Sequence, residues 1–170
     1  REPLGRSIAE VLVADALMAT GDLHRAVPLL RGAAATLAPT GYSWGPLAWM
    51  LLAQALGRLG EPVEAAKALG RAETRHGLKS MLFAPELALA RAWTMSSRGD
   101  VHGAVAAARD AVKAAERGSQ EAIALRAAVD AVRLGDPRGV DTLTRLCGVV
   151  DCAFGRTALA AVPAPTRRAD

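Results

Sequence analysis

A short turn recurs along this chain and limits what the chain can fold into. A glycine followed by an acidic residue occurs at Gly21, Gly60, Gly99 and Gly135, so successive copies are 39, 39 and 36 residues apart. Each copy ends one helical run and precedes another. Glycine readily takes the left-handed conformation that closes a helix, and an acidic side chain can cap the amide groups of the next helix. The spacing therefore predicts four helical hairpins in series.

Small residues recur in phase with these turns. Seven residues before each glycine lie Ala14, Ala53, Ala92 and Ala128, and five residues after it lie Ala26, Ala65, Ala104 and Val140. Four and seven residues further on come Leu30 and Ala33, Leu69 and Ala72, Ala108 and Ala111, then Thr144 and Cys147. This is the period of a helix face that packs against neighbouring helices. The fourth unit keeps the pattern least well, as terminal units often do.

Composition agrees with an all-α fold. Alanine accounts for 38 of the 170 residues, aromatic residues for only 4%, and hydrophobic residues for 51%. A chain this apolar is not disordered, and its few β-branched and aromatic residues argue against a sheet. The 18 arginines against 3 lysines indicate a GC-rich genome, which explains part of the alanine excess.

Charge and hydropathy exclude two classes of function. The net charge of +4 comes from 21 basic and 17 acidic residues that are interleaved, which is not the pattern of a polybasic surface for nucleic acid. The uncharged stretch 32–57 is interrupted by Pro39, Gly41, Gly45 and Pro46, so it predicts buried helix segments and no membrane span. Two cysteines and no signal peptide favour a cytoplasmic protein, and the start at Arg1 indicates a fragment of a longer one.

Helix boundaries follow from the turns and the periodicity. The predicted helices span 7–20, 23–38, 45–59, 62–76, 84–98, 101–117, 120–134 and 138–148, with a weaker one at 152–161. Residues 162–170 contain two prolines and an arginine pair, which predicts a linker or a frayed end.

Motifs of enzymes and metal sites have simpler explanations here. The segment 41–45 matches the G-x-S-x-G pattern around a nucleophilic serine, but a helix and not a strand precedes Ser43, so we interpret it as a linker. His24, His76 and His102 lack partners at ligand spacing, and Cys147 and Cys152 are better explained as small core residues. Neither nucleotide-binding glycine loop occurs in the sequence. We therefore predict no catalytic residues, no metal and no cofactor.

The second unit resembles a tetratricopeptide repeat (TPR). Residues at that family's key positions, in the family's order, are Trp49, Leu52, Ala53, Leu56, Ala65, Leu69 and Ala72. The other units lack the aromatic residue, and every period exceeds the roughly 34 residues usual for the family. The resemblance implies a right-handed α–α superhelix of about four hairpins, at 7–38, 45–76, 84–117 and 120–148 of a domain 1–148. Residues 149–170 would form the last short helix and a tail, and long links at 39–44 and 77–80 predict an irregular superhelix.

The resemblance also implies where a ligand would bind, because the first helices of such units line the concave face of the array. Placed on the family's pattern, the inner residues are Asp15, Met50, Gln54, Arg58, Glu86, Leu89, Trp93, Arg126, Val129 and Arg133. Three arginines, carboxylates, an amide and a tryptophan suit a small polar effector or a peptide. The alternative is that Trp93 packs between units and the arginines are solvated.

Long, Ala/Leu/Arg-rich repeats of this type are similar to the sensor region of actinobacterial LuxR-type, maltose-regulator-like transcription regulators. In that family a signal-transduction ATPase precedes the repeats and a DNA-binding helix-turn-helix domain follows them. The resemblance implies a non-enzymatic sensor or protein-interaction module that reaches DNA only through a helix-turn-helix domain outside this chain. A free-standing TPR scaffold that binds peptide segments is the alternative, and pairing with a second copy of the chain is left open.

Overall fold

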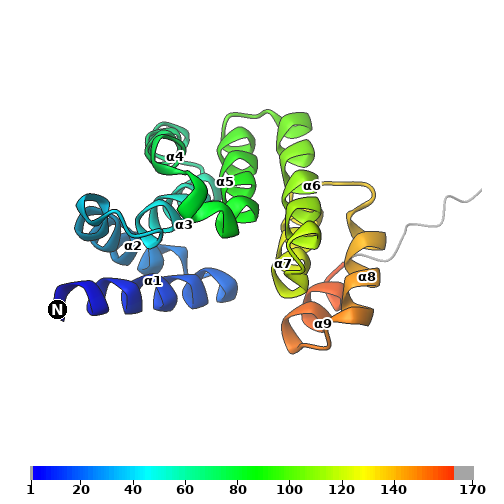
Figure 1. The fold of residues 1–170 in the computed structure, drawn as a ribbon. Coiled ribbons are helices and arrows are strands. Elements are labelled where there is room, and N and C mark those ends of the chain that lie inside the picture. The colour runs from blue at the N-terminus through cyan, green and yellow to red at the C-terminus, as the bar shows by residue number, and fades with distance from the viewer. Residues whose placement is uncertain (1, 163–170) are drawn as a thin grey trace, which may run out of the picture.

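The computed structural model describes residues 2–162, and all the regular structure among them is helical (Figure 1). The helices are α1 (Glu2–Thr20), α2 (Leu23–Leu37), α3 (Trp44–Arg58), α4 (Pro62–Arg75), α5 (Ala84–Ser97), α6 (Val101–Arg117), α7 (Glu121–Arg133), α8 (Gly139–Val149) and α9 (Ala153–Ala160). Two 3₁₀ segments, η1 (Ala38–Thr40) and η2 (Leu78–Phe83), lie in the links before α3 and α5. The prediction of an all-α fold is confirmed.

The predicted helix boundaries agree with the structure to within one residue, with one exception. The helix predicted to begin at residue 7 begins at Glu2. Pro3 is tolerated there because the first turn of a helix needs no backbone hydrogen bond from its N–H groups. The predicted tail at 162–170 falls outside the described residues, apart from Val162.

The recurring turns have the predicted backbone. Gly21, Gly60, Gly99 and Gly135 all have φ between 76° and 88°, in the left-handed region. Asp22 and Asp100 cap the following helices, since their carboxylates accept the backbone N–H of the residue three positions later. Glu61 makes no such cap, and the next residue is Pro62, which has no N–H group to be capped. The turn itself was therefore predictable, but not every cap.

Successive helices pack as hairpins in series. The first helix of each hairpin also contacts the first helix of the next, in the order α1, α3, α5 and α7. Each second helix, α2, α4 and α6, contacts the first helix that follows it. Figure 1 shows the hairpins side by side in chain order, with α8 and α9 at the end opposite α1. This arrangement brings α1, α3, α5 and α7 into one layer.

The in-phase alanines lie in the core. Ala14, Ala53, Ala92 and Ala128 are completely buried, and so are the later members Ala26, Ala65 and Ala104. Their small side chains let helices approach closely. Helices α3 and α5 approach closely at Gly57, where an added Cβ atom would lie 2.6 Å from the carbonyl oxygen of Trp93. The alanines that recur at the same position of each hairpin thus lie where the helices pack against one another.

The predicted register of the fourth hairpin is wrong by one position. Val140 and Cys147 are only partly buried and Thr144 is exposed, whereas α8 buries Gly139, Leu143 and Leu146. In the first three hairpins the second helix follows the acidic residue directly, but α8 begins three residues after Asp136. The inserted Pro137 and Arg138 rotate the helix face. A Cβ on Gly139 would meet Val132 at 2.9 Å, which explains the small residue there.

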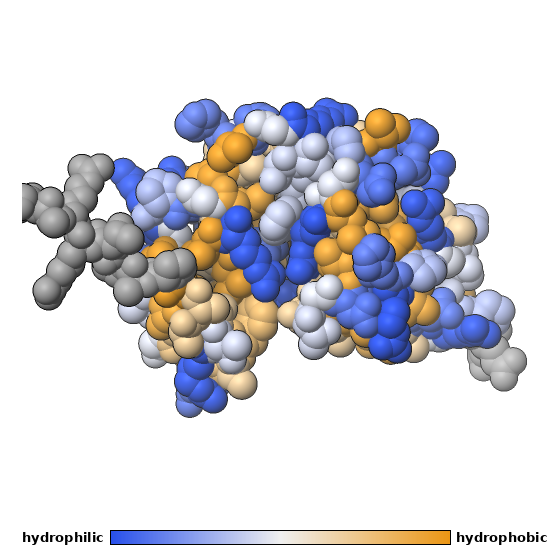
Figure 2. All heavy atoms as spheres, turned by 180° about the vertical axis from the view of Figure 1, so that it is seen from behind, coloured by the Kyte–Doolittle hydropathy of each residue, from blue (hydrophilic) through white to orange (hydrophobic). Residues whose placement is uncertain are grey.

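The surface is mixed in character. Figure 2 shows, on the back of the molecule, hydrophobic side chains in separate patches between charged ones. Across residues 2–162, no helix is both long enough and apolar enough to span a lipid bilayer.

Candidate functional site on the inner face

The inner-face residues predicted from the sequence lie on the adjacent first helices, and one ion pair joins the two ends of this layer. Arg126 of α7 donates two hydrogen bonds to the carboxylate of Asp15 of α1, from Nη1 to Oδ2 at 2.9 Å and from Nη2 to Oδ1 at 2.8 Å. The backbones of the two helices lie apart, although side chains of both helices line the pocket beside this ion pair. We call this ion pair the clasp, because it closes the layer α1, α3, α5, α7 from end to end.

Glu86 of α5 lies beside the clasp. It lines a pocket of about 80 Å³ together with Asp15 and Arg126. Burial raises the pKa of the Glu86 carboxyl, and a hydrogen bond from its own backbone N–H and the nearby guanidinium of Arg126 only partly oppose this effect. Its Oε2 atom is buried and has no hydrogen-bond partner among the described residues. A buried carboxylate oxygen without a hydrogen-bond partner makes ionisation of the group costly.

The clasp also changes the pKa of Arg126. Burial lowers the pKa of its guanidinium, but the hydrogen bonds and the charge of Asp15 outweigh burial, so the pKa is raised overall. About a third of each clasp side chain is exposed, 33% for Asp15 and 29% for Arg126. The pair is thus desolvated enough to be strong and exposed enough to be reached from solvent.

A second network joins α3, α5 and α7. The indole N–H of Trp93 donates to Oδ2 of Asp130 at 3.0 Å, and Nη1 of Arg133 donates to Oδ1 of the same carboxylate at 3.3 Å. The guanidinium of Arg58 lies 5.8 Å from the centre of the Trp93 ring. Arg58 also donates to the backbone oxygen of Met18 at 3.0 Å, which connects this network to α1.

Asp130 was missing from the predicted set. Its signal was present in the sequence, since Asp130 stands four residues after Arg126 and three before Arg133, on the same face of α7. Its carboxylate raises the pKa of Arg58, although burial outweighs it and the pKa is lowered overall. Within the described inner face, Asp130 holds two neighbouring side chains in place.

Met50 and Gln54 are not available to a ligand. Met50 is completely buried, and Leu89 and Val129 are buried as well. Gln54 is 2% exposed, and its amide donates to the backbone oxygen of Glu86 at 3.0 Å. These four residues pack the helices together. Asp15, Arg58, Glu86, Trp93 and Arg126 are partly buried, and Arg133 is exposed.

The charged side chains of the inner face interact mainly with one another. Three guanidinium groups meet the carboxylates of Asp15, Glu86 and Asp130, so the charges are largely balanced within the protein. The pocket beside the clasp is smaller than the ~300 Å³ at which small-molecule sites usually begin.

Residues suspected of other chemistry lie elsewhere. Ser43 precedes α3 in a helical link, without the strand that a nucleophile elbow requires. His24 and His102 are exposed at the starts of α2 and α6, whereas Nδ1 of His76 lies 2.9 Å from Oγ of Ser80. Both cysteines are free and partly buried beside the core formed by α5 to α8. In the described part of the chain, no group of three or more candidate ligands is placed to hold a metal ion.

Comparison of this chain with protein-family models, with curated proteins and with solved structures found no match.

Proposed function

We propose that this chain is a non-enzymatic sensor or interaction module, built as a TPR-like superhelix that binds a partner on its inner face. The hairpins in series and the contacts between first helices support the superhelix. The clasp supports the binding role, because a single solvent-accessible ion pair connects helices 111 positions apart in the sequence. The proposed setting is the cytoplasm.

The proposed mechanism is competition for Arg126. A carboxylate on an effector or on a protein partner takes the place of Asp15, and α1 is released from α7. Solenoid curvature depends on small rotations between repeats, so the loss of an end-to-end contact permits a more open array. A ligand shifts such an equilibrium by as much as it prefers the open form. Domains attached to the repeats would respond to this change.

The proposed biological setting is a LuxR-type regulator of the maltose-regulator-like group, in which the repeats lie between an ATPase and a helix-turn-helix domain. The length of the repeats and their Ala/Leu/Arg-rich composition support this setting. The coding sequence on both sides tests it. An ATPase loop upstream and a helix-turn-helix downstream support the regulator, whereas adjacent start and stop codons would favour a free-standing scaffold.

The binding site is tested by a thermal-shift screen of acidic peptides and small dicarboxylic acids, followed by calorimetric titration of the compounds that bind. We expect Arg126→Gln to lose affinity, because the incoming carboxylate loses its partner. Arg133→Gln should weaken binding less, since Arg133 is exposed at the end of the same face. Arg117→Gln, which removes an exposed arginine of α6, is the matched control. Equal affinities in all four proteins would exclude the inner face as the site.

A further inference from the structure

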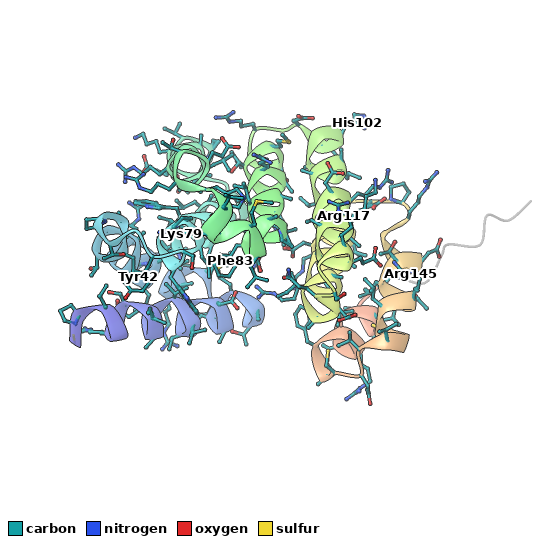
Figure 3. The ribbon with its side chains drawn as sticks, viewed as in Figure 1. Tyr42, Lys79, Phe83, His102, Arg117 and Arg145 are labelled. Carbon is teal, nitrogen blue, oxygen red and sulfur yellow. The ribbon has the colours of Figure 1, made fainter. Side chains whose placement is uncertain are left out.

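The two long links between hairpins come together on the side of the molecule away from α6 to α9. The first link, with η1, carries Tyr42, and the second, with η2, carries Lys79. Both residues line one open pocket of about 340 Å³. Figure 3 shows Tyr42 and Lys79 close together and far from Arg117 and Arg145. We call this site the linker pocket. Its volume lies within the range of small-molecule sites.

The charged residues that line the linker pocket are all basic. Arg75, from the last turn of α4, and Lys79 line it, and none of its lining residues is acidic. Across residues 2–162 neither cation forms an ion pair, and Arg75 only donates to the backbone oxygen of Arg71 at 3.5 Å. On the inner face, by contrast, Arg126 and Arg133 are paired with carboxylates. Two cations that line one pocket without a carboxylate suit an anionic ligand.

The walls of the linker pocket are apolar. Ala38, Pro46 and Leu78 line it beside the ring of Tyr42. Leu78 is 93% exposed and Tyr42 is 56% exposed, so both offer apolar surface that the fold itself does not cover. A flat hydrocarbon ring would bury part of this surface, and stacking on Tyr42 would add to the binding energy.

Both links are held in shape by local hydrogen bonds. Ser80 is 2% exposed, and its Oγ accepts the backbone N–H of Gly77 at 3.0 Å. In the other link, Oγ1 of Thr40 donates to the backbone oxygen of Leu37 at 2.6 Å and accepts the backbone N–H of Tyr42 at 3.2 Å. Binding then requires little ordering of the backbone, which favours affinity for a small ligand.

We propose that the linker pocket binds a small aromatic carboxylate, with the ring against Tyr42 and Leu78 and the carboxylate on Arg75 and Lys79. The site shares no residue with the inner face, so it is independent of the proposed function. It also gives a role to the link lengths that exceed those of ordinary repeats.

The test is a titration of the ¹⁵N-labelled chain with benzoate, followed by amide chemical shifts. We expect changes concentrated at Gly41, Tyr42, Gly77 and Leu78. Benzyl alcohol, which lacks the charge, and acetate, which lacks the ring, should bind at least about tenfold more weakly, since each loses one kind of contact. Equal binding of either compound, or shifts spread over the whole surface, would overturn the proposal.

Variants of the pocket make the test specific. Arg75→Gln combined with Lys79→Gln should weaken benzoate binding at least about tenfold. Arg98→Gln combined with Arg117→Gln removes the same charge from exposed arginines outside the pocket and should leave the affinity unchanged. Tyr42→Ala should weaken binding without altering the fold, because the ring is exposed. Unchanged affinity in the Arg75/Lys79 variant, with thermal melting like that of the wild type, would contradict the proposal.

Discussion

Arg126 of α7 donates two hydrogen bonds, of 2.8 and 2.9 Å, to the carboxylate of Asp15 of α1, which lies 111 positions earlier in the sequence. The backbones of these two helices are separated by α3 and α5. Among the ion pairs of residues 2–162, the clasp is the one that joins the first helix of this layer to the last.

Breaking the clasp should both destabilise and open the chain. We expect Asp15→Asn to lower the free energy of unfolding by about 1 to 2 kcal/mol, since it weakens a partly buried charged pair. The radius of gyration from small-angle X-ray scattering should increase. Glu10→Gln, which removes the pair of Arg6 and Glu10 on α1, is the control and should change stability by less than about 0.5 kcal/mol. Strictly additive effects of Asp15→Asn and Arg126→Gln would show that the two residues are not coupled.

Gly57 should not tolerate a side chain. A Cβ there would lie 2.6 Å from a backbone oxygen of α5, so α3 and α5 would have to separate. We expect Gly57→Ala to lower the unfolding free energy by about 2 to 3 kcal/mol in urea titrations. Gly70→Ala in α4 is the matched control, because nothing lies within 4 Å of its Cβ position. It should raise stability by up to about 1 kcal/mol through helix propensity. Similar losses in both variants would contradict the close-approach explanation.

Glu86 should make stability fall as pH rises. Burial raises the pKa of its carboxyl above the unfolded value near 4.5. The folded state then favours the neutral acid, and this contribution is lost as pH rises through the raised pKa. Glu86→Gln should therefore melt at a higher temperature than the wild type at pH 7 and at the same temperature below pH 4. A gain of equal size at both values would contradict burial of the charge as its cause.

Asp136 should have the opposite pH dependence. It accepts hydrogen bonds from Nε and Nη2 of Arg109 at 3.0 and 2.5 Å, and the bonded guanidinium holds the pKa of its carboxyl below the usual value. Its stabilising effect is present above pH 4 and is lost as pH falls through the lowered pKa. We expect Asp136→Asn to cost about 1 to 2 kcal/mol at pH 7 in urea titrations, and less in acid. Asp151→Asn, in an exposed pair with Arg156, is the control and should cost almost nothing.

Local chemistry accounts for most of what could be predicted. Helix ends depend on neighbouring residues, such as the left-handed Gly99 and the capping Asp100, so they can be read from short segments. The phase of the alanines predicted the buried faces for the same reason. The predicted buried face is wrong for α8. Two residues inserted after Asp136 rotate this helix, so that Gly139 and not Val140 faces α7.

The candidate site was predicted less completely. The family pattern assigned Asp15, Arg126 and Trp93 to first helices, where the structure also has them, but it could not show which of them pair. Asp130 was missed because no repeat position marks it, although it receives hydrogen bonds from both Trp93 and Arg133. Met50 was assigned to the inner face but lies in the core. Rotation of a helix by a fraction of a turn is enough to move a side chain from the inner face into the core.

The sequence by itself determined the helices, their turns and the hairpin order, because each depends on contacts between residues near one another along the chain. The tertiary structure alone decided that Asp15 meets Arg126 and that the two long links enclose a pocket beside Tyr42 and Lys79. Both features depend on the angle between successive hairpins. Small differences in that angle accumulate along the array, so the distance between its ends follows only from the packing of all the helices together.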